Sequence, residues 1–505
     1  MANKRLMLRN ALLAGGMLAA SAVAAQERMV RMTTVKEVGS PITLLVNQNM
    51  RGVIVDWGDG NPVTYAQEGE SPLVRIEGTV KGSHLSVQGY GDWFMLNCEN
   101  CGLTELDLSG ATGLHSLYCS GNELTSLDLR NMKYLVDLDC SNNQLATLVF
   151  TDSNNPDQDL SSIESMNLSN NAFTDRYYYK LPTLQYLNIS GNQIEKFYVY
   201  DENLRSLDCS NNRISVSLNL SKCTKLQTLN CQGNEIPTLT FANKGAMAEQ
   251  VICDGNQIKS IDLSSGENLV DISCTDNGLT DLNISGSAKL SSMNVGGNSL
   301  TFSVLPTKLN APTWLSFEPQ APFDISEVDG MQMKDGVPYA ELAPSWADKG
   351  TTAIDLRDFC SLAGGRLDAN YQWFTVDENG EATEMTRRTT SSGTGDYYVT
   401  NGKFSFFTPQ KRAYAQLTSK TYGFVVQSQP IAIGDDVTSI GTTVADNGLQ
   451  VSVDGGQLQL SSAQPVQATV VSLEGKVVWK NTVSGSVSLS LPKGVYIVNG
   501  QKVIL

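Results

Sequence analysis

The dominant pattern in the chain is a short group of apolar positions that recurs about every 21 residues between residues 93 and 306. Each copy follows the template L-x-x-L-x-C-x-x-N-x-L-x-x-L-x-L, as in the copies that begin at Leu114 and Leu269. Apolar residues at the fourth and sixth positions, with polar residues between them, are typical of a half-buried strand. Because one copy cannot bury its apolar side chains alone, the pattern predicts a stack of about ten copies that cover one another.

This period and this consensus resemble the leucine-rich repeat, in which each copy adds one strand to a curved solenoid. The resemblance implies a mainly β chain with its solenoid at residues 93–306. Neighbouring strands lie about 4.8 Å apart, so ten strands would line a concave surface about 48 Å long. A solenoid needs its first copy covered, and we expect residues 26–92 to form an N-terminal β cap.

Two inward columns carry polar or polarizable residues. The sixth position of the template is cysteine in seven copies: Cys98, Cys119, Cys140, Cys209, Cys231, Cys253 and Cys274. The ninth position is Cys101 in the first copy and asparagine in all the others: Asn122, Asn143, Asn171, Asn192, Asn212, Asn234, Asn256, Asn277 and Asn298. An asparagine amide at the end of a strand can bond buried backbone groups that would otherwise cost about 1–3 kcal/mol each. We therefore predict a structural role for this column.

Ten cysteines would indicate a disulfide framework in a secreted protein. In one column of parallel strands, however, the Cβ atoms are separated by about 4.8 Å, whereas a disulfide needs about 3.8 Å. The sequence therefore predicts a ladder of free, buried thiols, with no metal and no cofactor, because a ladder spreads its ligands along a line. The pairing of Cys101, Cys223 and Cys360 stays open.

The outward positions of the strands are the candidates for partner binding. Interfaces draw their binding energy from a few aromatic or arginine side chains, and on the predicted concave face these are Tyr118, Tyr186 and Arg205. Acidic side chains accompany them at Asp137, Asp139 and Asp208. A solvated face without a specific ligand is the alternative.

A second candidate surface follows an insertion at residues 151–161, which makes the third copy seven residues longer than its neighbours. Tyr177, Tyr178 and Tyr179 come soon after it, and the next copy contains Tyr198 and Tyr200. The template places Phe197 and Val199 inward, so Tyr198 and Tyr200 should lie outside. Such a tyrosine patch would suit a contact site, or it would pack against the insertion.

The segments that flank the repeats show the short, alternating strands of all-β domains. In residues 26–92, the run from Val55 to Gly60 resembles the W-G-D-G turn of polycystic-kidney-disease-type β-sandwiches. Asp56 and Asp59 fall short of the six to eight oxygens that calcium requires, so we expect a plain turn. In residues 307–433, the segment around Trp373 resembles the buried-tryptophan strand of an immunoglobulin-like sandwich. Ala415 stands where a second cysteine would be needed, so no inter-sheet disulfide is expected.

Both ends of the chain carry targeting signals. Residues 1–25 combine a basic start, an apolar run and an Ala22-Val23-Ala24 cleavage site, which is typical of a secretory signal peptide. Residues 434–505 are predicted to form a second small β-sandwich. This segment contains the sequence Pro492-Lys493-Gly494-Val495-Tyr496-Ile497-Val498, followed by a basic residue and an apolar terminus. This motif resembles the C-terminal sorting domain of Bacteroidetes type IX secretion cargo. The resemblance implies recognition by that secretion machinery, passage across the outer membrane and attachment to surface lipopolysaccharide. No later segment has 18 unbroken apolar residues, so no transmembrane helix is expected.

The repeats are similar to those of internalin J-like surface proteins, which also have cysteine where leucine usually stands. This resemblance implies adhesion to a host or bacterial cell-surface protein, with biofilm cohesion as one outcome. A net charge of -16 argues against nucleic acid as a partner. The chain has only two histidines, His84 and His115, and no common catalytic motif, so we expect no enzyme. The alternatives are a glycan-binding module and, less favoured, a hydrolase that uses the carboxylates of Asp137 and Asp139.

Overall fold

The computed structural model describes residues 28–47, 52–65, 73–89, 93–130, 132–149, 162–174, 181–307, 311–334, 336–377, 379–434, 443–444, 449–454, 457–472, 477–491, 495–498 and 501–504. The predicted signal peptide, the insertion at 151–161, Tyr177 to Tyr179, and Pro492 to Gly494 of the sorting motif lie outside these residues. The described chain is mainly β, as predicted, and divides into two compact units.

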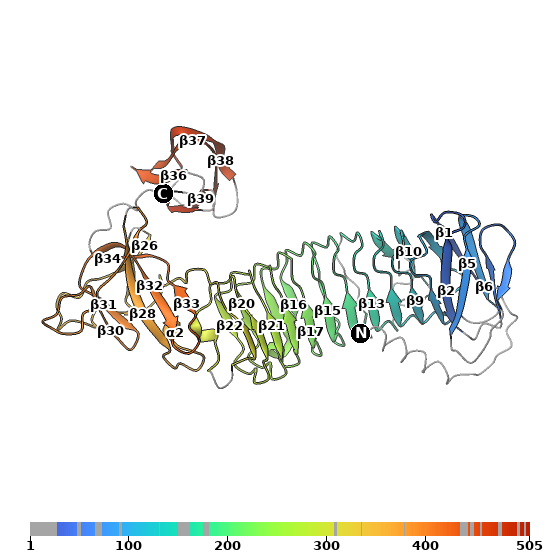
Figure 1. Ribbon diagram of the computed structural model, residues 1–505, viewed down its shortest axis with the longest axis horizontal. Coiled ribbons are helices and arrows are strands. Elements are labelled where there is room, and N and C mark those ends of the chain that lie inside the picture. The colour runs from blue at the N-terminus through green and yellow to red at the C-terminus, as the bar shows by residue number, and fades with distance from the viewer. Residues whose placement is uncertain are drawn as a thin grey trace. The chain divides into compact units, whose positions relative to one another are not determined.

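The first unit is built on one long sheet of thirteen strands (Figure 1). Eleven of them run parallel, one from each turn of the solenoid: β7 (Met95–Asn97), β9 (Ser116–Tyr118), β11 (Asp137–Asp139), β13 (Ser165–Asn167), β14 (Tyr186–Asn188), β15 (Ser206–Asp208), β17 (Thr228–Asn230), β19 (Gln250–Ile252), β21 (Asp271–Ser273), β23 (Ser292–Asn294) and β24 (Trp314–Ser316). In β7 to β23 the central residue of each strand is buried and its two neighbours are mostly half-buried, whereas the central residue of β24, Leu315, is half-buried. The predicted leucine-rich-repeat solenoid is therefore present.

The opposite side of the solenoid carries shorter pieces of parallel sheet. They pair in twos: β10 (Ser126–Asp128) with β12 (Thr147–Val149), β16 (Leu218–Leu220) with β18 (Leu239–Phe241), and β20 (Ser260–Asp262) with β22 (Asp281–Asn283). Four of these six strands bury only their central residue. That residue occupies one of the last two leucine positions of the template and points into the solenoid. The core of each turn thus lies between the main sheet and this second row of strands.

A β-sandwich precedes the solenoid and is joined to it through both of its sheets. The first sheet places β4 (Val63–Tyr65), β3 (Val53–Asp56), β6 (His84–Gly89) and β1 (Arg28–Thr34) beside β8 (Leu103–Asp107) of the first turn. The second continues the main sheet with β2 (Pro41–Asn47), which pairs with β7, and β5 (Leu73–Thr79). Trp93 is fully buried and donates its indole N–H to the carbonyl of Arg28, 3.3 Å away. These contacts cover the first turn, which is the role expected of a cap.

The W-G-D-G segment of this sandwich is a turn held by its own aspartates. Asp56 Oδ1 accepts the N–H groups of Gly58 and Gly60, and Asp59 pairs with Lys81 at 2.9 Å. Asp59 Oδ1 also accepts the N–H of Asn61, so both carboxylates bond backbone groups of the segment, as expected for a plain turn.

Each asparagine of the ninth column ties its turn to the preceding one. Asn212 donates its Nδ2 hydrogens to the carbonyls of Cys209 in its own turn and Ile189 in the turn before, at 3.1 and 3.0 Å. Its Oδ1 accepts the N–H of Ile194, again in the preceding turn, at 3.0 Å. The other eight asparagines of the column make the equivalent contacts. We call this column the asparagine ladder.

The seven cysteines of the sixth column are fully buried and free, and so form the predicted ladder. The other three, Cys101, Cys223 and Cys360, are also buried and free. Burial raises the pKa of Cys101 to about 11 and the pKa values of Cys223 and Cys360 to about 12. Buried thiols with raised pKa values act as small apolar core residues rather than as nucleophiles.

The residue just before the ninth position of each template copy adopts a left-handed backbone conformation. This eighth position is always asparagine, aspartate or glycine, with φ between +52° and +69°: Asn100, Gly121, Asn142, Asn170, Gly191, Asn211, Gly233, Gly255, Asp276 and Gly297. Such φ values favour these residue types. Several of the glycines also lie under the side chain of the turn before, as Gly191 does under Asn170.

The solenoid extends beyond the boundary predicted at residue 306. Residues 299–309 belong to the second unit, but residues 310–319 return to the first, where β24 pairs in parallel with β23. At β24, Leu315 and Phe317 occupy the fourth and sixth template positions, but the rest of the consensus is absent. The template therefore did not identify this strand. The sheet therefore ends in an eleventh parallel strand that the periodicity did not reveal.

The second unit contains two β domains. The first pairs β28 (Ala369–Val376) with β32 (Gln410–Ser419) in a sheet that also holds β25 (Met331–Lys334), β26 (Val337–Ala340), β29 (Ala382–Glu384), β33 (Val425–Gln427) and β34 (Ile431–Ile433). A smaller sheet contains β27 (Ile354–Asp355), β31 (Lys403–Phe406) and β30 (Tyr397–Thr400). Trp373 is fully buried and packs edge-on against Phe404 and Phe406 of the smaller sheet, opposite Ala415 on β32.

The second domain consists of β35 (Thr443–Val444), β36 (Gln450–Asp454), β37 (Gln457–Ser472), β38 (Val477–Leu489), β39 (Val495–Val498) and β40 (Gln501–Ile504). The sequence predicts separate strands at 457–460 and 468–473, but the structure joins them in β37, which pairs along its length with β38. The pairing shifts register between Ser462 and Val466, around Pro465. Proline has no N–H to donate to a neighbouring strand, but it is tolerated at such a register shift. The strand therefore continues through Pro465.

We predict that Gly191→Ala destabilises the solenoid more than Gly255→Ala. Both glycines have left-handed φ values, +65° and +62°. A Cβ at Gly191 would lie 2.3 Å from Asn170 Oδ1, whereas the nearest atom at Gly255 is 3.9 Å away. Asn170 would have to rotate and lose its hydrogen bond to Asn142. Urea unfolding should show a further loss of about 1 kcal/mol for the first variant; equal losses would contradict this packing.

Candidate functional site

The outward side chains of the main sheet form a regular surface along the first unit. We call this surface the sheet face: the residues at the second, third, fifth and seventh template positions on β7 to β24. The parallel register brings equivalent positions of successive turns side by side, as with Tyr186 and Ser206, or Asn188 and Asp208. Each residue on this face therefore has a fixed neighbour on either side, which a partner would meet as a rigid array.

Aspartates and asparagines at the fifth position fasten the turn that follows each strand. Asp139 Oδ1 accepts both the N–H and the hydroxyl of Ser141, at 3.0 and 2.7 Å, and Asp208 does the same with Ser210. The second oxygen of Asp139 accepts the amide of Asn167 on the next strand at 3.1 Å. These two predicted partner-binding residues thus have a structural function, which limits their freedom to contact a partner.

Tyr118 and Asp137 are not exposed anchors, contrary to the prediction. Only 7% of Tyr118 and 6% of Asp137 is exposed, and the Tyr118 hydroxyl donates to Asp137 Oδ2 on the neighbouring strand. Burial raises the pKa of both groups. The template register put Tyr118 on the correct side of the strand, but its side chain reaches across to the next turn instead of projecting outward.

Tyr186 and Arg205 remain accessible on the sheet face. Tyr186 is 43% exposed and Arg205 is half-buried. They belong to adjacent strands, since the N–H of Ser206, next to Arg205, bonds to the carbonyl of Gln185, next to Tyr186. Glu164 is exposed one turn earlier, and its carbonyl accepts the N–H of Tyr186. An aromatic ring, a guanidinium and a carboxylate therefore lie on three consecutive turns.

A stack of three rings borders the sheet face on its first turns. The ring centroids of Phe94 and His115 are 4.3 Å apart, those of His115 and Tyr134 are 5.7 Å apart, and the planes lie within 20° of parallel. Lys133 places its ammonium 4.9 Å from the Tyr134 ring. The sequence pattern did not identify Tyr134, because it precedes the template. His115 is fixed between two rings, and its Nδ1 contacts the carbonyl of Gly113, so it is a packing residue here.

The tyrosine patch is only partly within the described residues. Phe197 and Val199 are buried, with 1% and 3% exposed, and Tyr200 is 51% exposed. Tyr198 is half-buried. These side chains therefore alternate as the template predicts, and Tyr198 with Tyr200 stays a candidate contact surface away from the main sheet.

Three more exposed apolar side chains lie on the C-terminal turns, and the sequence analysis missed them. Met247 and Val270 are each 42% exposed, and Trp314 is 52% exposed. Met247 precedes its template copy, and Trp314 lies on the strand that the periodicity did not reveal. Val270 occupies a second position, where its apolar character among polar neighbours was an available signal.

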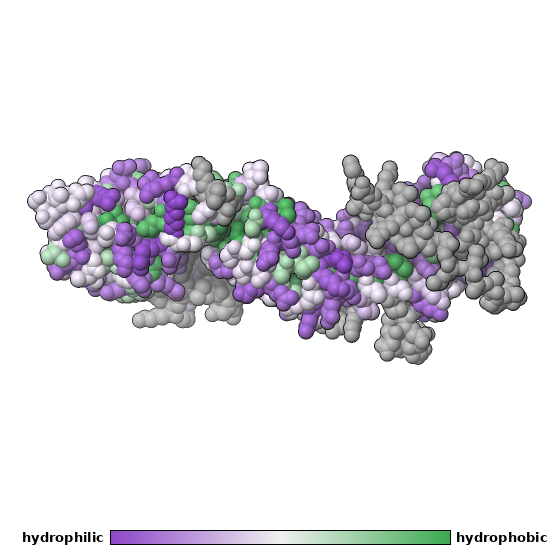
Figure 2. All heavy atoms as spheres, turned by 90° about the horizontal axis from the view of Figure 1, so that it is seen from below, coloured by the Kyte–Doolittle hydropathy of each residue, from purple (hydrophilic) through white to green (hydrophobic). Residues whose placement is uncertain are grey.

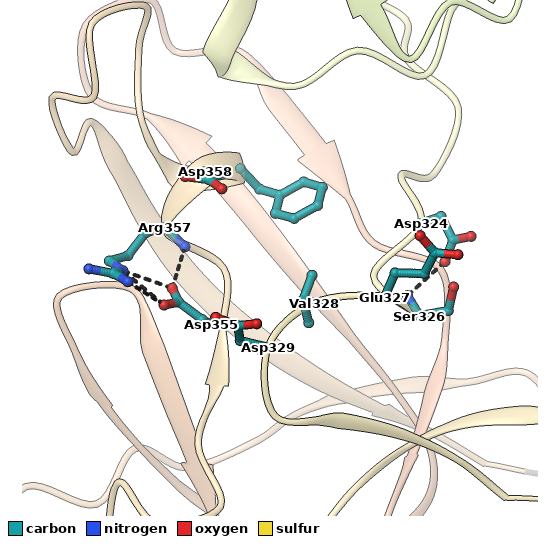
Figure 3. Close-up of a pocket in the computed structure, with 9 residues that line it drawn as sticks. Asp324, Ser326, Glu327, Val328, Asp329, Asp355, Arg357 and Asp358 are labelled. Carbon is teal, nitrogen blue, oxygen red and sulfur yellow. Dashed lines mark hydrogen bonds and ion pairs between the residues drawn. The ribbon is translucent and has the colours of Figure 1, made fainter.

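A cavity of about 500 Å³ lies in the first β domain of the second unit. Figure 3 shows Asp324 and Glu327 at one side and Asp355, Arg357 and Asp358 at the other, with Val328 between them. Arg357 and Lys403 bind Asp355 at 2.6 and 3.3 Å, and the Arg357 guanidinium is the main cause that lowers the pKa of Asp355 to about 2. In the part of the chain that the structure describes, no three His, Cys, Asp or Glu side chains converge as metal ligands.

One carboxylate inside the solenoid lacks full hydrogen bonding. Asp201 is 2% exposed, in a column that holds Ala111, Met132 and Cys223 in other turns. Its Oδ1 accepts the N–H of Leu181 at 3.0 Å, but its Oδ2 has no hydrogen-bond partner among the described residues. Burial raises the pKa of Asp201 to about 6. The sequence signal for this site was a charged residue in a column that otherwise holds small or apolar residues.

Comparisons with known proteins agree with the repeat architecture. Residues 202–243 match the family described as Leucine Rich repeats (2 copies). No curated protein matches the chain. None of the described helices is long and apolar enough to cross a membrane.

Several solved structures resemble the chain at low identity. A domain of InlJ from Listeria monocytogenes that includes a cysteine ladder is 16% identical, with 67% of this chain and 90% of that chain covered and a TM-score of 0.29. YopM from Yersinia pestis is 22% identical over 42% of this chain and 56% of that chain, with a TM-score of 0.35. The internalin InlF from Listeria monocytogenes is 20% identical over 41% and 68%, with a TM-score of 0.30. The fold assignment rests on the repeats and strands themselves.

We predict that Asp201→Asn stabilises the protein increasingly as the pH rises from 4 to 7. The carboxyl has a higher pKa in the folded chain, about 6, than its ordinary value of 3.8. The folded state therefore binds more protons than the unfolded state in this range, and the wild type loses about 3 kcal/mol relative to the neutral amide. Denaturant unfolding of both proteins at several pH values measures this difference. A difference that does not change with pH would show that Asp201 is not held in an apolar site.

Proposed function

We propose that the protein binds a partner protein through its sheet face, with Tyr186 and Arg205 as the main contacts. The observation that carries this proposal is the exposed Tyr186 ring beside Arg205 on a sheet whose strands are fixed turn by turn. Tyrosine and arginine are enriched among residues that dominate binding energy. Because the sheet is rigid, such a surface loses little conformational entropy on binding.

The proposed setting is the bacterial cell surface, where the protein would adhere to host cells or to neighbouring bacteria. Two sequence features support this setting: the signal-peptide pattern of residues 1–25 and the sorting-domain motif near the C-terminus. In the last domain, Tyr496 and Val498 of that motif belong to the buried core with Leu458 and Val470. The resemblance of the repeats to internalin J-like proteins also favours adhesion, with biofilm cohesion as one outcome of the same binding.

The same surface gives little support to a hydrolase. The acid pair considered for catalysis, Asp137 and Asp139, is engaged in hydrogen bonds to Tyr118, Ser141 and Asn167. The side of the molecule drawn in Figure 2 is largely hydrophilic, with hydrophobic areas among the hydrophilic residues. Binding of a glycan is the alternative, for which the exposed rings of Tyr186 and Tyr200 would serve.

We predict that replacing both Tyr186 and Arg205 by alanine lowers binding of the full chain to its target cells by about tenfold or more, because two central contacts are lost. The measurement is the amount of fluorescently labelled protein bound to host cells and to the bacteria that produce it. The control variant replaces Tyr198 and Tyr200 by alanine, which removes two tyrosines outside the main sheet and should leave binding unchanged.

The outcomes separate the alternatives. Loss with the control variant alone would move the site to the tyrosine patch and contradict the proposal. Binding that survives protease treatment of the cells but not glycosidase treatment would identify a glycan. If the wild type binds neither cell type, the adhesion proposal fails.

A further inference from the structure

The C-terminal turns of the sheet face differ in chemistry from the rest of it. We call Glu249, Val270, Asp271 and Trp314 on this face, together with Met247 just before its template copy, the C-terminal patch. Its three apolar side chains are each more than 40% exposed, and one of them is a tryptophan. An exposed tryptophan on a rigid sheet offers a large contact area at little entropic cost, and tryptophan is strongly enriched at binding hot spots.

The strand pairing places Glu249 beside Val270 and Asp271, with Trp314 two strands further along the sheet. The N–H groups of Val270 and Asp271 both bond to the carbonyl of Glu249, at 2.8 and 3.2 Å. Ser291 then bonds to Val270, and Trp314 to Ser291, at 2.9 and 3.0 Å. Val270 and Trp314 therefore stand two strands apart, about 10 Å along the sheet. At the level of Val270 and Trp314, the chain between them contributes only the small side chains of Ser291 and Ser292.

The patch is acidic and its carboxylates are held in place. Glu249 accepts the amide of Gln227, and Asp271 accepts the amide of Gln250, each at 2.9 Å. Neither carboxylate forms an ion pair with any residue in the described parts of the chain. At the second, third, fifth and seventh positions of β17 to β24 there is no lysine or arginine at all. The only cation at these positions of the sheet face, Arg205, belongs to β15.

A surface of this kind is complementary to a basic segment that also carries apolar side chains. A lysine or arginine gains from the face of a tryptophan ring and from nearby carboxylates at the same time. Val270 and Met247 would meet the apolar side chains of that segment. Nucleic acid, which is itself anionic, would be repelled.

We propose that the C-terminal patch binds a positively charged segment of a partner protein that also carries apolar side chains. In this arrangement a lysine or arginine lies against the ring of Trp314, and further basic groups meet Asp271 and Glu249. The proposal rests on the function proposed for the sheet face, since it names the chemistry of the partner at one part of that surface.

The test uses the full chain and a short labelled peptide of lysine, arginine, leucine and glycine. A second peptide, with glutamate in place of every basic residue, is the probe control. Fluorescence anisotropy should show binding of the basic peptide only. Trp314→Ala should weaken this binding by about 30-fold, and Glu249→Gln combined with Asp271→Asn by about tenfold. Trp314→Phe, which keeps an aromatic ring, should lose less than Trp314→Ala and so separates ring contact from misfolding.

The matched control for charge is Glu235→Gln combined with Asp281→Asn. Both residues are exposed, lie outside the main sheet, and change the net charge by the same amount. Equal loss in this variant would mean that the peptide responds only to the overall negative charge, and would overturn the proposal, as would unchanged binding by Trp314→Ala.

The cell-binding measurement distinguishes this proposal from the one on which it rests. If the wild type binds cells through Tyr186 and Arg205 but does not bind the basic peptide, the proposed function stands and the assignment of the C-terminal patch falls. If the wild type binds neither cells nor peptide, both are overturned.

Discussion

The asparagine ladder is the contact on which the rest of the solenoid depends. Each of its side-chain amides forms hydrogen bonds to backbone groups of two successive turns. These carbonyl and N–H groups lie at the ends of the strands. Replacing such an amide would leave buried carbonyls and N–H groups unpaired, at about 1–3 kcal/mol each. The leucine and cysteine columns supply apolar burial, but burial alone is not directional. The hydrogen bonds of the ladder fix the distance between turns, and with it the geometry of the sheet face.

The inward half of this architecture could be predicted from the sequence because it repeats. The cysteine column, the ninth-position asparagines and the buried Phe197 and Val199 all follow from the template. The outward half could not be predicted with the same success, since it depends on the direction of individual side chains. Tyr118 lies at an outward position, yet its hydroxyl reaches Asp137 and both are buried.

Other misses have equally local causes. Trp314 continues the main sheet after a segment that packs elsewhere, so its strand has no periodic signal. The long strand β37 continues through a register shift around Pro465, where the sequence predicted a gap between two separate strands. Tyr134 and Met247 stand just before their template copies, so the consensus does not include them. The sequence therefore predicted which strands carry the candidate surface. Which of its residues are accessible, Tyr186 above all, could be established only from the structure.

This division also explains how the fold serves binding. The inward columns leave little freedom of sequence, whereas the outward positions vary from turn to turn on a constant scaffold. Different regions of one face thereby acquire different chemistry: a ring stack at its first turns, Tyr186 with Arg205 in the middle, and an acidic, apolar patch at its end. A face with this gradation suits an extended protein partner better than a small molecule, which would need an enclosed pocket.

The most direct test of this account is hydrogen exchange in Asn212→Ala, with Asn219→Ala as the control. Asn219 bonds only the N–H of Ser221 in the described structure, on the exposed second row of strands. If the ladder couples successive turns, loss of the Asn212 amide should speed the exchange of Ile194 and other amides in the preceding turn, as well as in its own. Faster exchange confined to the turn of Asn212, or equal effects in both variants, would contradict the claim that the asparagines hold the sheet face together.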